Sequence, residues 1–268
     1  MEKRLTEQLL EGVTDTDIAE ALGYREEAGP TEEVPLGPVP ERPLPEWSDV
    51  VSPAAYEFIR TWETGGKAYY EGVIKGRPIW PGYSSGITIG CGYDLGYHER
   101  AEFTADWSSR IPAEAMRRLD GAIGFRTVDP GRDAKVAQAK DLVRSLSDIQ
   151  ISWDVAVAQF DDSKMPALVG QLERALPNLD RLHPHSYGAL LSLVFNRGAS
   201  FRSSSPRFAE MVEIRKLMEQ GTPSAFALIP AQLRAMERIW GVGSSLAKRR
   251  RGEAQLFEQG LQETGPAS

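Results

Sequence analysis

Apolar residues recur at helical spacing near residue 52, where the folded region is predicted to begin. The positions i, i+3, i+4 and i+7 of one helix face are occupied by Ala55, Phe58, Ile59 and Trp62. Ser52 followed by Pro53 suits the first turn of a helix, and the pair Gly65 and Gly66 suits its end. The pattern therefore predicts a helix over 52–63.

The pattern changes after this helix and becomes helical again later in the chain. Strand-forming residues are concentrated at 68–74 and 86–92, and a loop containing Pro78, Pro81 and Gly82 joins the two segments. From about residue 110 the spacing is helical nearly to the end, with Pro- and Gly-marked loops between the helices. The expected fold class is α+β, with a small β-hairpin lobe and a large helical lobe.

The N-terminal part has a different character. A short helix is predicted within 2–24, followed by six prolines between residues 30 and 45 that favour an extended, semi-stiff linker. Residues 1–50 hold 13 acidic and 4 basic side chains, whereas 51–268 are nearly neutral. We therefore expect an acidic, mostly extended arm over 1–46 and one folded domain over 47–268.

Two absences from the sequence shape the expected location. No apolar run approaches the roughly 18 residues of a membrane span, and the first residues lack the apolar core of a signal peptide. Synthesis in the cytoplasm is expected, so that a target outside it must be reached by another route. The single cysteine, Cys91, excludes an internal disulfide and argues against a cysteine-based zinc site.

Candidate chemistry lies between Trp62 and Tyr97. Glu63 is placed in the last turn of the predicted helix, where Trp62 and Phe58 would desolvate its carboxyl and raise its pKa. Thr88 falls within the second predicted strand, and Asp94 follows at the exit of that strand. A carboxylic acid, a hydroxyl and a second carboxylate are the groups that hydrolyse a glycosidic bond.

Each of these residues also has a purely structural interpretation. Glu63 could be a solvated carboxylate near a helix end, Thr88 an ordinary strand threonine and Asp94 a turn residue. Cys91, between two glycines, reads as a small core residue and not as a nucleophile, because no base or cation is evident beside it.

The combination of motifs resembles a known family. Glu63 followed by the segment TIGCGYDLG resembles the catalytic region of phage-type lysozymes, and the closer likeness is to their pesticin-like branch. In that branch the second carboxylate follows the threonine in a GYD segment, whereas an aspartate precedes the threonine in ordinary phage enzymes. By this resemblance Glu63 is the general acid, Asp94 is the second carboxylate and Thr88 helps to hold the attacking water. Glu71, before the threonine, is the reserve candidate for the second carboxylate.

Segments later in the chain extend the resemblance to about 51–263. The FNxG element ends at Gly198 and contains Asn196 and Arg197, and the segment SSLAKRRRGEAQLFEQG resembles the closing helix of such enzymes. The resemblance implies substrate positioning by Asn196 and Arg197 and makes Arg249 a candidate partner for Glu63. A structural role, as a helix cap or a solvated basic face, is the alternative for all three.

The implied activity is that of a muramidase. The resemblance implies cleavage of the β-1,4 bond between N-acetylmuramic acid and N-acetylglucosamine in peptidoglycan, with no metal and no organic cofactor. Inversion at the anomeric carbon would require the two carboxyl groups to stand roughly 6.5–9.5 Å apart, and about 5 Å would indicate retention. The other hypothesis is a catalytically silent lysozyme fold that binds glycan or serves as a structural module of a phage particle or secretion apparatus.

The expected partner is the glycan strand of peptidoglycan, acted on in the periplasm after secretion, uptake or holin release. The acidic arm is interpreted as a docking segment for an immunity protein or a delivery machine, and its removal is expected to leave catalysis intact. Its negative charge opposes nucleic-acid binding, although 14–27 resembles half of a helix-turn-helix. A monomer is expected, and a delivered antibacterial effector, a phage endolysin and a bacteriocin all fit the sequence.

Overall fold

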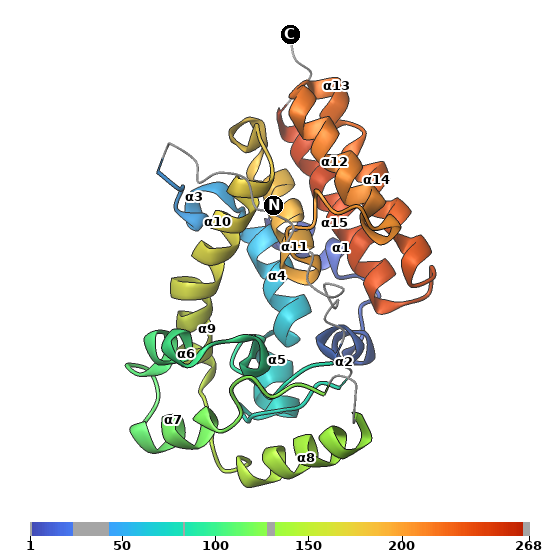
Figure 1. Cartoon of the computed structure of the whole chain (residues 1–268). Helices are drawn as coiled ribbons and strands as arrows, with labels where there is room; N and C mark the ends of the chain where they lie inside the picture. The colour runs from blue at the N-terminus through green and yellow to red at the C-terminus, as the bar shows by residue number, and fades with distance from the viewer. Residues whose placement is uncertain (1, 24–42, 83, 128–131, 265–268) are drawn as a thin grey trace. The chain divides into compact units, whose positions relative to one another are not determined.

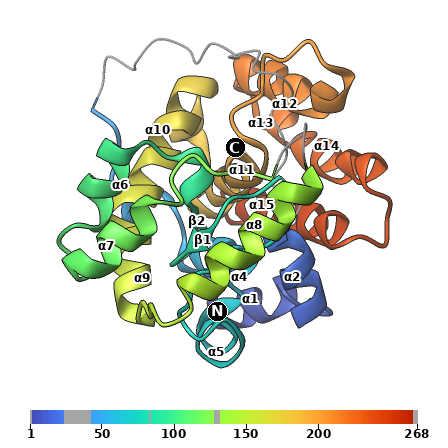
Figure 2. The same ribbon diagram turned by 60° about the horizontal axis from the view of Figure 1, so that its bottom comes forward.

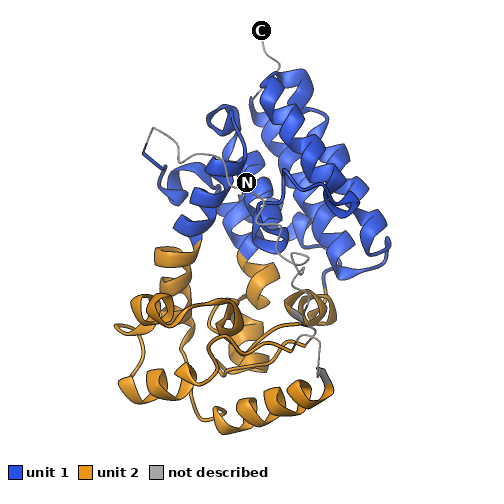
Figure 3. Ribbon diagram, in the orientation of Figure 1, with its two compact units in different colours: residues 1–13, 26–59, 165–268 blue, residues 14–25, 60–164 orange. Residues whose placement is uncertain are grey.

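The computed structural model describes residues 2–23, 43–82, 84–127 and 132–264. Most of the proline-rich linker predicted from the sequence lies outside these residues. The chain divides into two compact units, and each is described by itself (Figure 3). Unit 1 contains 1–13, 26–59 and 165–268, and unit 2 contains 14–25 and 60–164.

Unit 1 is built from helices (Figure 1). Its α-helices are α1 (Glu2–Leu9), α3 (Trp47–Val50), α10 (Met165–Ala175), α11 (Pro184–Arg197), α12 (Ala209–Gln220), α13 (Pro223–Phe226), α14 (Ile229–Ala235) and α15 (Ser245–Thr264). Its 3-10 turns are η4 (Leu179–Arg181), η5 (Pro206–Phe208) and η6 (Met236–Ile239). Helix α4 (Pro53–Thr64) begins in this unit and ends in unit 2.

The core of unit 1 forms around α11. Every residue of this helix from His185 to Val194 is buried, and α11 packs against α15 and α10. Helix α15 also packs against α14 and α1. A helix that is covered on all sides requires neighbours on all sides, which explains why α11 carries apolar and small residues around its whole circumference.

The predicted N-terminal helix is two helices in different units. Helix α1 buries Leu5 and Leu9 and packs against α15, whereas α2 (Asp15–Gly23) belongs to unit 2. Residues 2–9 are thus part of the packed core of unit 1 and not an extended arm. The predicted boundary near Glu46 stays a prediction.

Unit 2 combines short helices with one small sheet. Its helices are α5 (Gly66–Tyr69), α6 (Arg100–Trp107), α7 (Ala113–Asp120), α8 (Arg132–Ser145) and α9 (Trp153–Gln159), with the π-helical turns η1 (Tyr70–Ile74) and η3 (Phe160–Lys164) and the 3-10 turn η2 (Leu95–Tyr97). Strands β1 (Thr88–Ile89) and β2 (Tyr93–Asp94) pair antiparallel (Figure 2). An isolated bridge from Ile79 to Thr88 adds a third chain segment on the other side of β1.

The helix predicted over 52–63 is confirmed as α4, which ends at Thr64 before Gly65 in the left-handed conformation. The prediction of a strand over 68–74 is wrong, because this segment forms α5 and η1. Tyr70 is buried there, and its hydroxyl donates to the carbonyl of Ile151 at 3.0 Å. A helical turn that places this ring in the core overrides the strand preference of the local sequence.

The described part of the chain is mostly helical with one two-stranded antiparallel sheet, in agreement with the predicted α+β class. Among the helices of the described residues, none has both the length and the apolar character required to cross a bilayer.

Candidate functional site

Glu63 lies in the last turn of α4, directly after the buried Trp62. The glutamate is 9% exposed. Gly65, in the left-handed conformation, ends the helix immediately behind it. Helix end, buried ring and glycine together hold a largely buried carboxyl group at a fixed place on unit 2.

Thr88 and Asp94 are directly opposite each other across the hairpin. Leu95 N–H donates to the carbonyl of Ile87 at 2.9 Å, so the neighbouring pair is hydrogen-bonded across the strands. The two kinds of pair alternate, which makes Thr88 and Asp94 a non-hydrogen-bonded pair with Cα atoms about 4.5 Å apart. Their side chains therefore emerge close together on the same face of the hairpin.

The backbone N–H and C=O of Thr88 are both hydrogen-bonded, whereas its side-chain hydroxyl bonds to none of the described residues. It exchanges two backbone hydrogen bonds with Ile79, at 2.8 and 3.0 Å. Its Oγ1 is buried and has no hydrogen-bond partner among the described residues. A buried hydroxyl that makes no internal bond is available to a water molecule or a ligand.

Asp94 is completely buried and hydrogen-bonded to backbone. Both carboxylate oxygens lie 3.1 Å from Gly86 N, and Oδ1 also accepts from Gly96 N at 2.9 Å. Backbone donors of this kind stabilise an ionised carboxylate. Asp94 thus places a carboxyl group beside Thr88 and at the same time connects the segments on either side of the hairpin.

The electrostatics of Cys91 relate Glu63 to this hairpin. Cys91 lies in the turn between β1 and β2 and is buried. Burial raises the pKa of its thiol to about 12; Arg60 opposes the rise, whereas the charges of Asp161 and Glu63 add to it. The carboxyl of Glu63 is therefore close enough to the hairpin turn for its charge to act there.

Arg60 and Asp161 are two charged residues near Cys91 that the sequence interpretation missed. Arg60 also stacks over Trp153, with the guanidinium carbon 5.2 Å from the ring centroid. The signal for Arg60 was its position three residues before Glu63, which puts both on neighbouring parts of one helix face. No local signal marks Asp161, which reaches the hairpin only through the tertiary fold.

Glu71, the reserve candidate, is in a different setting. It lies on η1, not before a strand, and it pairs with Lys67 at 3.8 Å. Its side chain is 55% exposed. The structure therefore brings Asp94, and not Glu71, opposite Thr88.

The predicted positioning residues belong to unit 1. Arg197 donates to the carbonyl of Arg207 at 2.7 Å and stacks over Trp240. Asn196 accepts a hydrogen bond from Arg250 at 3.2 Å. These contacts are the ones expected of structural residues, and a role of Asn196 and Arg197 toward a substrate stays a prediction.

Arg249 is also buried in unit 1, within a compact ionic cluster. It donates to the carbonyl of Ser192 at 3.1 Å and lies 3.4 Å from Glu253, which in turn accepts from Arg250 at 2.8 Å. Burial raises the pKa of Glu253, and the two arginines and the Ser192 hydroxyl oppose that rise. This cluster joins α11 to α15 and gives Arg249 a structural task; its predicted pairing with Glu63 stays untested.

Comparison of the chain with protein-family models, with curated proteins and with solved structures gives no match. The chemistry must accordingly be inferred from the site itself. Unit 2 offers a largely buried acid at a helix end, a buried hydroxyl without a partner among the described residues and a second carboxyl group beside it. Such a set can protonate one oxygen, hold a water molecule and stabilise a developing positive charge.

Proposed function

We propose that the chain is a peptidoglycan hydrolase, an N-acetylmuramidase of lysozyme-like fold. The observation that supports this most strongly is the cross-strand pair of Thr88 and Asp94 on the hairpin of unit 2, the unit that also holds the largely buried Glu63. The resemblance to the pesticin-like branch rests on the same three residues. The substrate is then the β-1,4 bond between N-acetylmuramic acid and N-acetylglucosamine.

In the proposed reaction Glu63 gives its proton to the glycosidic oxygen as the bond to the anomeric carbon breaks. Water bound at the Thr88 hydroxyl attacks that carbon, and its proton passes to the carboxylate of Glu63 left by the first step, which restores the acid. The products are a reducing N-acetylmuramic acid end and a free 4-hydroxyl on the next sugar. Because both oxygens of Asp94 already accept backbone hydrogen bonds, its main contribution is the negative charge that stabilises the oxocarbenium-like transition state.

One observation favours a second function, a glycan-binding or structural module without catalysis. Asp94 has no exposed surface, so it can act as a brace of the hairpin without ever meeting a water molecule. A binding module would keep the same hairpin and tolerate the loss of Glu63.

Mass spectrometry of muropeptides separates the two proposals. Purified peptidoglycan treated with the full chain should release fragments that end in reducing N-acetylmuramic acid, and Glu63→Gln should release none while its circular dichroism stays unchanged. Glu114→Gln is the matched control, because Glu114 is an exposed partner of Arg117 in the same unit. Release by Glu63→Gln at the wild-type rate would refute the assignment, and sedimentation with peptidoglycan without any release would establish the binding module.

The proposal extends to the setting of the enzyme. A delivered antibacterial effector or a phage endolysin would act as a monomer on the cell wall in the periplasm. The acidic N-terminal segment would then dock an immunity protein or a delivery machine. Proton NMR of the first product anomer would decide between inversion and retention.

A further inference from the structure

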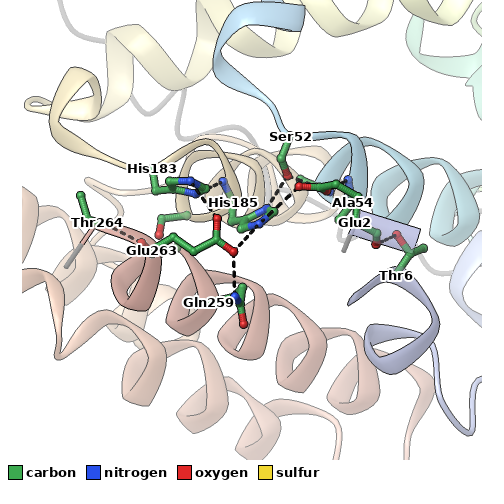
Figure 4. A network of polar contacts seen from close by, with 12 residues as sticks. Glu2, Thr6, Ser52, Ala54, His183, His185, Gln259, Glu263 and Thr264 are labelled. Carbon is green, nitrogen blue, oxygen red and sulfur yellow. Dashed lines mark hydrogen bonds and ion pairs between the residues drawn. The ribbon is translucent and has the colours of Figure 1, made fainter. Parts of the chain in front are cut away.

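Two of the three histidines of the chain meet a glutamate inside unit 1. His183 and His185 lie at the start of α11, and Glu263 lies in the last turn of α15 (Figure 4). One ligand atom from each residue lies within 4.8 Å of the others. His185 is buried, whereas His183 and Glu263 are partly exposed.

The distances within this cluster suit a metal ion better than direct hydrogen bonds. Glu263 Oε2 is 3.3 Å from His183 Nε2, and Glu263 Oε1 is 3.5 Å from His185 Nε2. Charge-assisted hydrogen bonds are shorter, about 2.7–2.9 Å. A tetrahedral zinc site with bonds of about 2.0–2.1 Å places neighbouring ligand atoms roughly 3.3–3.4 Å apart.

Glu2 of α1 lies beside the cluster, outside the group of three whose ligand atoms are all within 4.8 Å of one another. Glu2 Oε1 lies 3.7 Å from His185 Nε2, on the same ring nitrogen that faces Glu263. The other oxygen of Glu2 accepts the backbone N–H of Ala54 at 2.8 Å (Figure 4). Glu2 is thereby held with one oxygen fixed and the other directed toward the cluster.

Outer hydrogen bonds orient the remaining groups. His185 Nδ1 is 2.6 Å from Ser52 Oγ, and Gln259 donates to Glu263 Oε1 at 2.7 Å. Metal-binding histidines and carboxylates are regularly fixed by such second partners. His183 Nδ1 accepts the N–H of His185 at 3.2 Å. A metal ion on Nε2 would put a proton on Nδ1, and this long hydrogen bond would then be lost.

We propose that His183, His185, Glu263 and Glu2 bind one divalent ion of the zinc class. Imidazole and carboxylate are ligands that zinc accepts. His183, His185 and Glu263 supply three ligand atoms, and a rotation of the Glu2 side chain would bring in the fourth that closes the coordination sphere. The ion would clip α1 to α11 and α15. His183 also lines a cavity of about 400 Å³, together with Thr264 and Leu261, which provides an entry path. This site is separate from the residues of the proposed hydrolase and does not depend on that function.

The test uses the full chain without an affinity tag, freed of metal by dialysis against a chelator. Zinc should bind with a stoichiometry of one in isothermal titration calorimetry and should raise the melting temperature. Cobalt in the same site should give the intense visible bands of a four-coordinate ion. Glu263→Gln should weaken zinc binding more than about 10-fold, since even outer partners of metal ligands contribute about 10- to 100-fold.

Glu258→Gln is the matched control on α15, because Glu258 pairs with Arg234 outside the cluster, and it should bind zinc as the wild type does. Glu2→Gln provides a second variant if Glu263→Gln does not fold; Glu2 is 44% exposed, and its loss should weaken zinc binding and shift the cobalt bands. Absence of stoichiometric binding by the wild type, or unchanged binding by both ligand variants, would overturn the proposal and leave a hydrogen-bonded cluster only.

Discussion

Asp94 holds the backbone of Gly86 with both of its carboxylate oxygens, each 3.1 Å from the Gly86 nitrogen. Gly86 has no room for a side chain there, because a Cβ atom would lie 2.4 Å from the Phe125 carbonyl oxygen and 2.6 Å from Asp94 Oδ1. The segment before β1 is therefore fixed by the residue that faces Thr88 from β2. Any effect of Asp94 on catalysis must be separated from its effect on the hairpin.

The first prediction is that Asp94→Asn lowers stability as well as activity. With the oxygen kept at the Oδ1 position, where it accepts from Gly86 and Gly96, the Oδ2 position becomes an NH₂ group that lies against the Gly86 N–H, donor facing donor. The free energy of unfolding should fall by about 1–3 kcal/mol, measured by urea denaturation, and muropeptide release should fall with it. An Asp94→Asn variant that no longer releases muropeptides but is as stable as the wild type would show that Asp94 supports activity through its charge and not by holding the hairpin together.

The second prediction separates chemistry from structure at Thr88. Thr88→Val preserves the shape of the side chain and removes a buried hydroxyl that has no partner among the described residues. The free energy of unfolding, measured in urea, should be unchanged or slightly higher than that of the wild type, because an unsatisfied buried polar group is removed. The turnover of peptidoglycan should nevertheless fall about 10-fold or more if the hydroxyl holds the attacking water. Full activity of Thr88→Val would refute that role.

Much of unit 2 followed from local sequence signals. The i, i+3, i+4, i+7 spacing predicted α4. The strand predicted over 86–92 is only partly right, because β1 is limited to Thr88–Ile89 and residues 90–92 form the turn to β2. The segment 68–74 was misread because Tyr70 and Val73 favour strands in isolation, whereas burial of the Tyr70 ring against Ile151 favours a helical turn. Short elements are decided by such tertiary contacts, and a single sequence does not reveal them.

Parts of the candidate site could not be predicted from the sequence, for a related reason. The sequence placed Asp94 at the exit of the strand that holds Thr88, whereas the structure puts it opposite Thr88 on a second strand, and its bonds to Gly86 arise when the hairpin closes. The cluster of Ser192, Arg249 and Glu253 joins residues of two helices. An RRR run reads as a solvated basic face until the partner helix is known.

The third prediction concerns Cys91 and pH. Its pKa is raised to about 12 by burial, so the thiol stays protonated in the folded state over the range in which a free cysteine ionises. Iodoacetamide at pH 8.5 should label the native chain far more slowly than the chain in urea. The folded state binds the extra proton above about pH 8.5, and its stability should therefore fall as pH rises further toward 12. Native labelling as fast as that of the unfolded chain would contradict this environment.

The fourth prediction tests the ionic cluster of unit 1. Glu253→Gln removes a fully buried acidic partner that Arg249 and Arg250 share. The free energy of unfolding should fall by about 3–5 kcal/mol. Glu258→Gln, which breaks a half-exposed pair with Arg234 on the same helix, should cost less than about 1 kcal/mol. Equal losses in urea denaturation would show that burial of the cluster contributes little.

The fifth prediction concerns α1. The sequence favoured a detachable arm over 1–46, but Leu5 and Leu9 are buried, and α1 packs against α15. We therefore expect α1 to stabilise unit 1, whatever partner the acidic segment recruits.

Leu9→Ala in the full chain should lower the free energy of unfolding by about 2–5 kcal/mol, because it opens a cavity between α1 and α15. Gln8→Ala is the matched control, since Gln8 is exposed on the same helix, and it should change stability by less than about 0.5 kcal/mol. Removal of 1–46 should lower the melting temperature in the same direction, while muropeptide release at low temperature should persist because Glu63, Thr88 and Asp94 all remain. A truncated chain as stable as the full one would restore the interpretation of α1 as an appended arm.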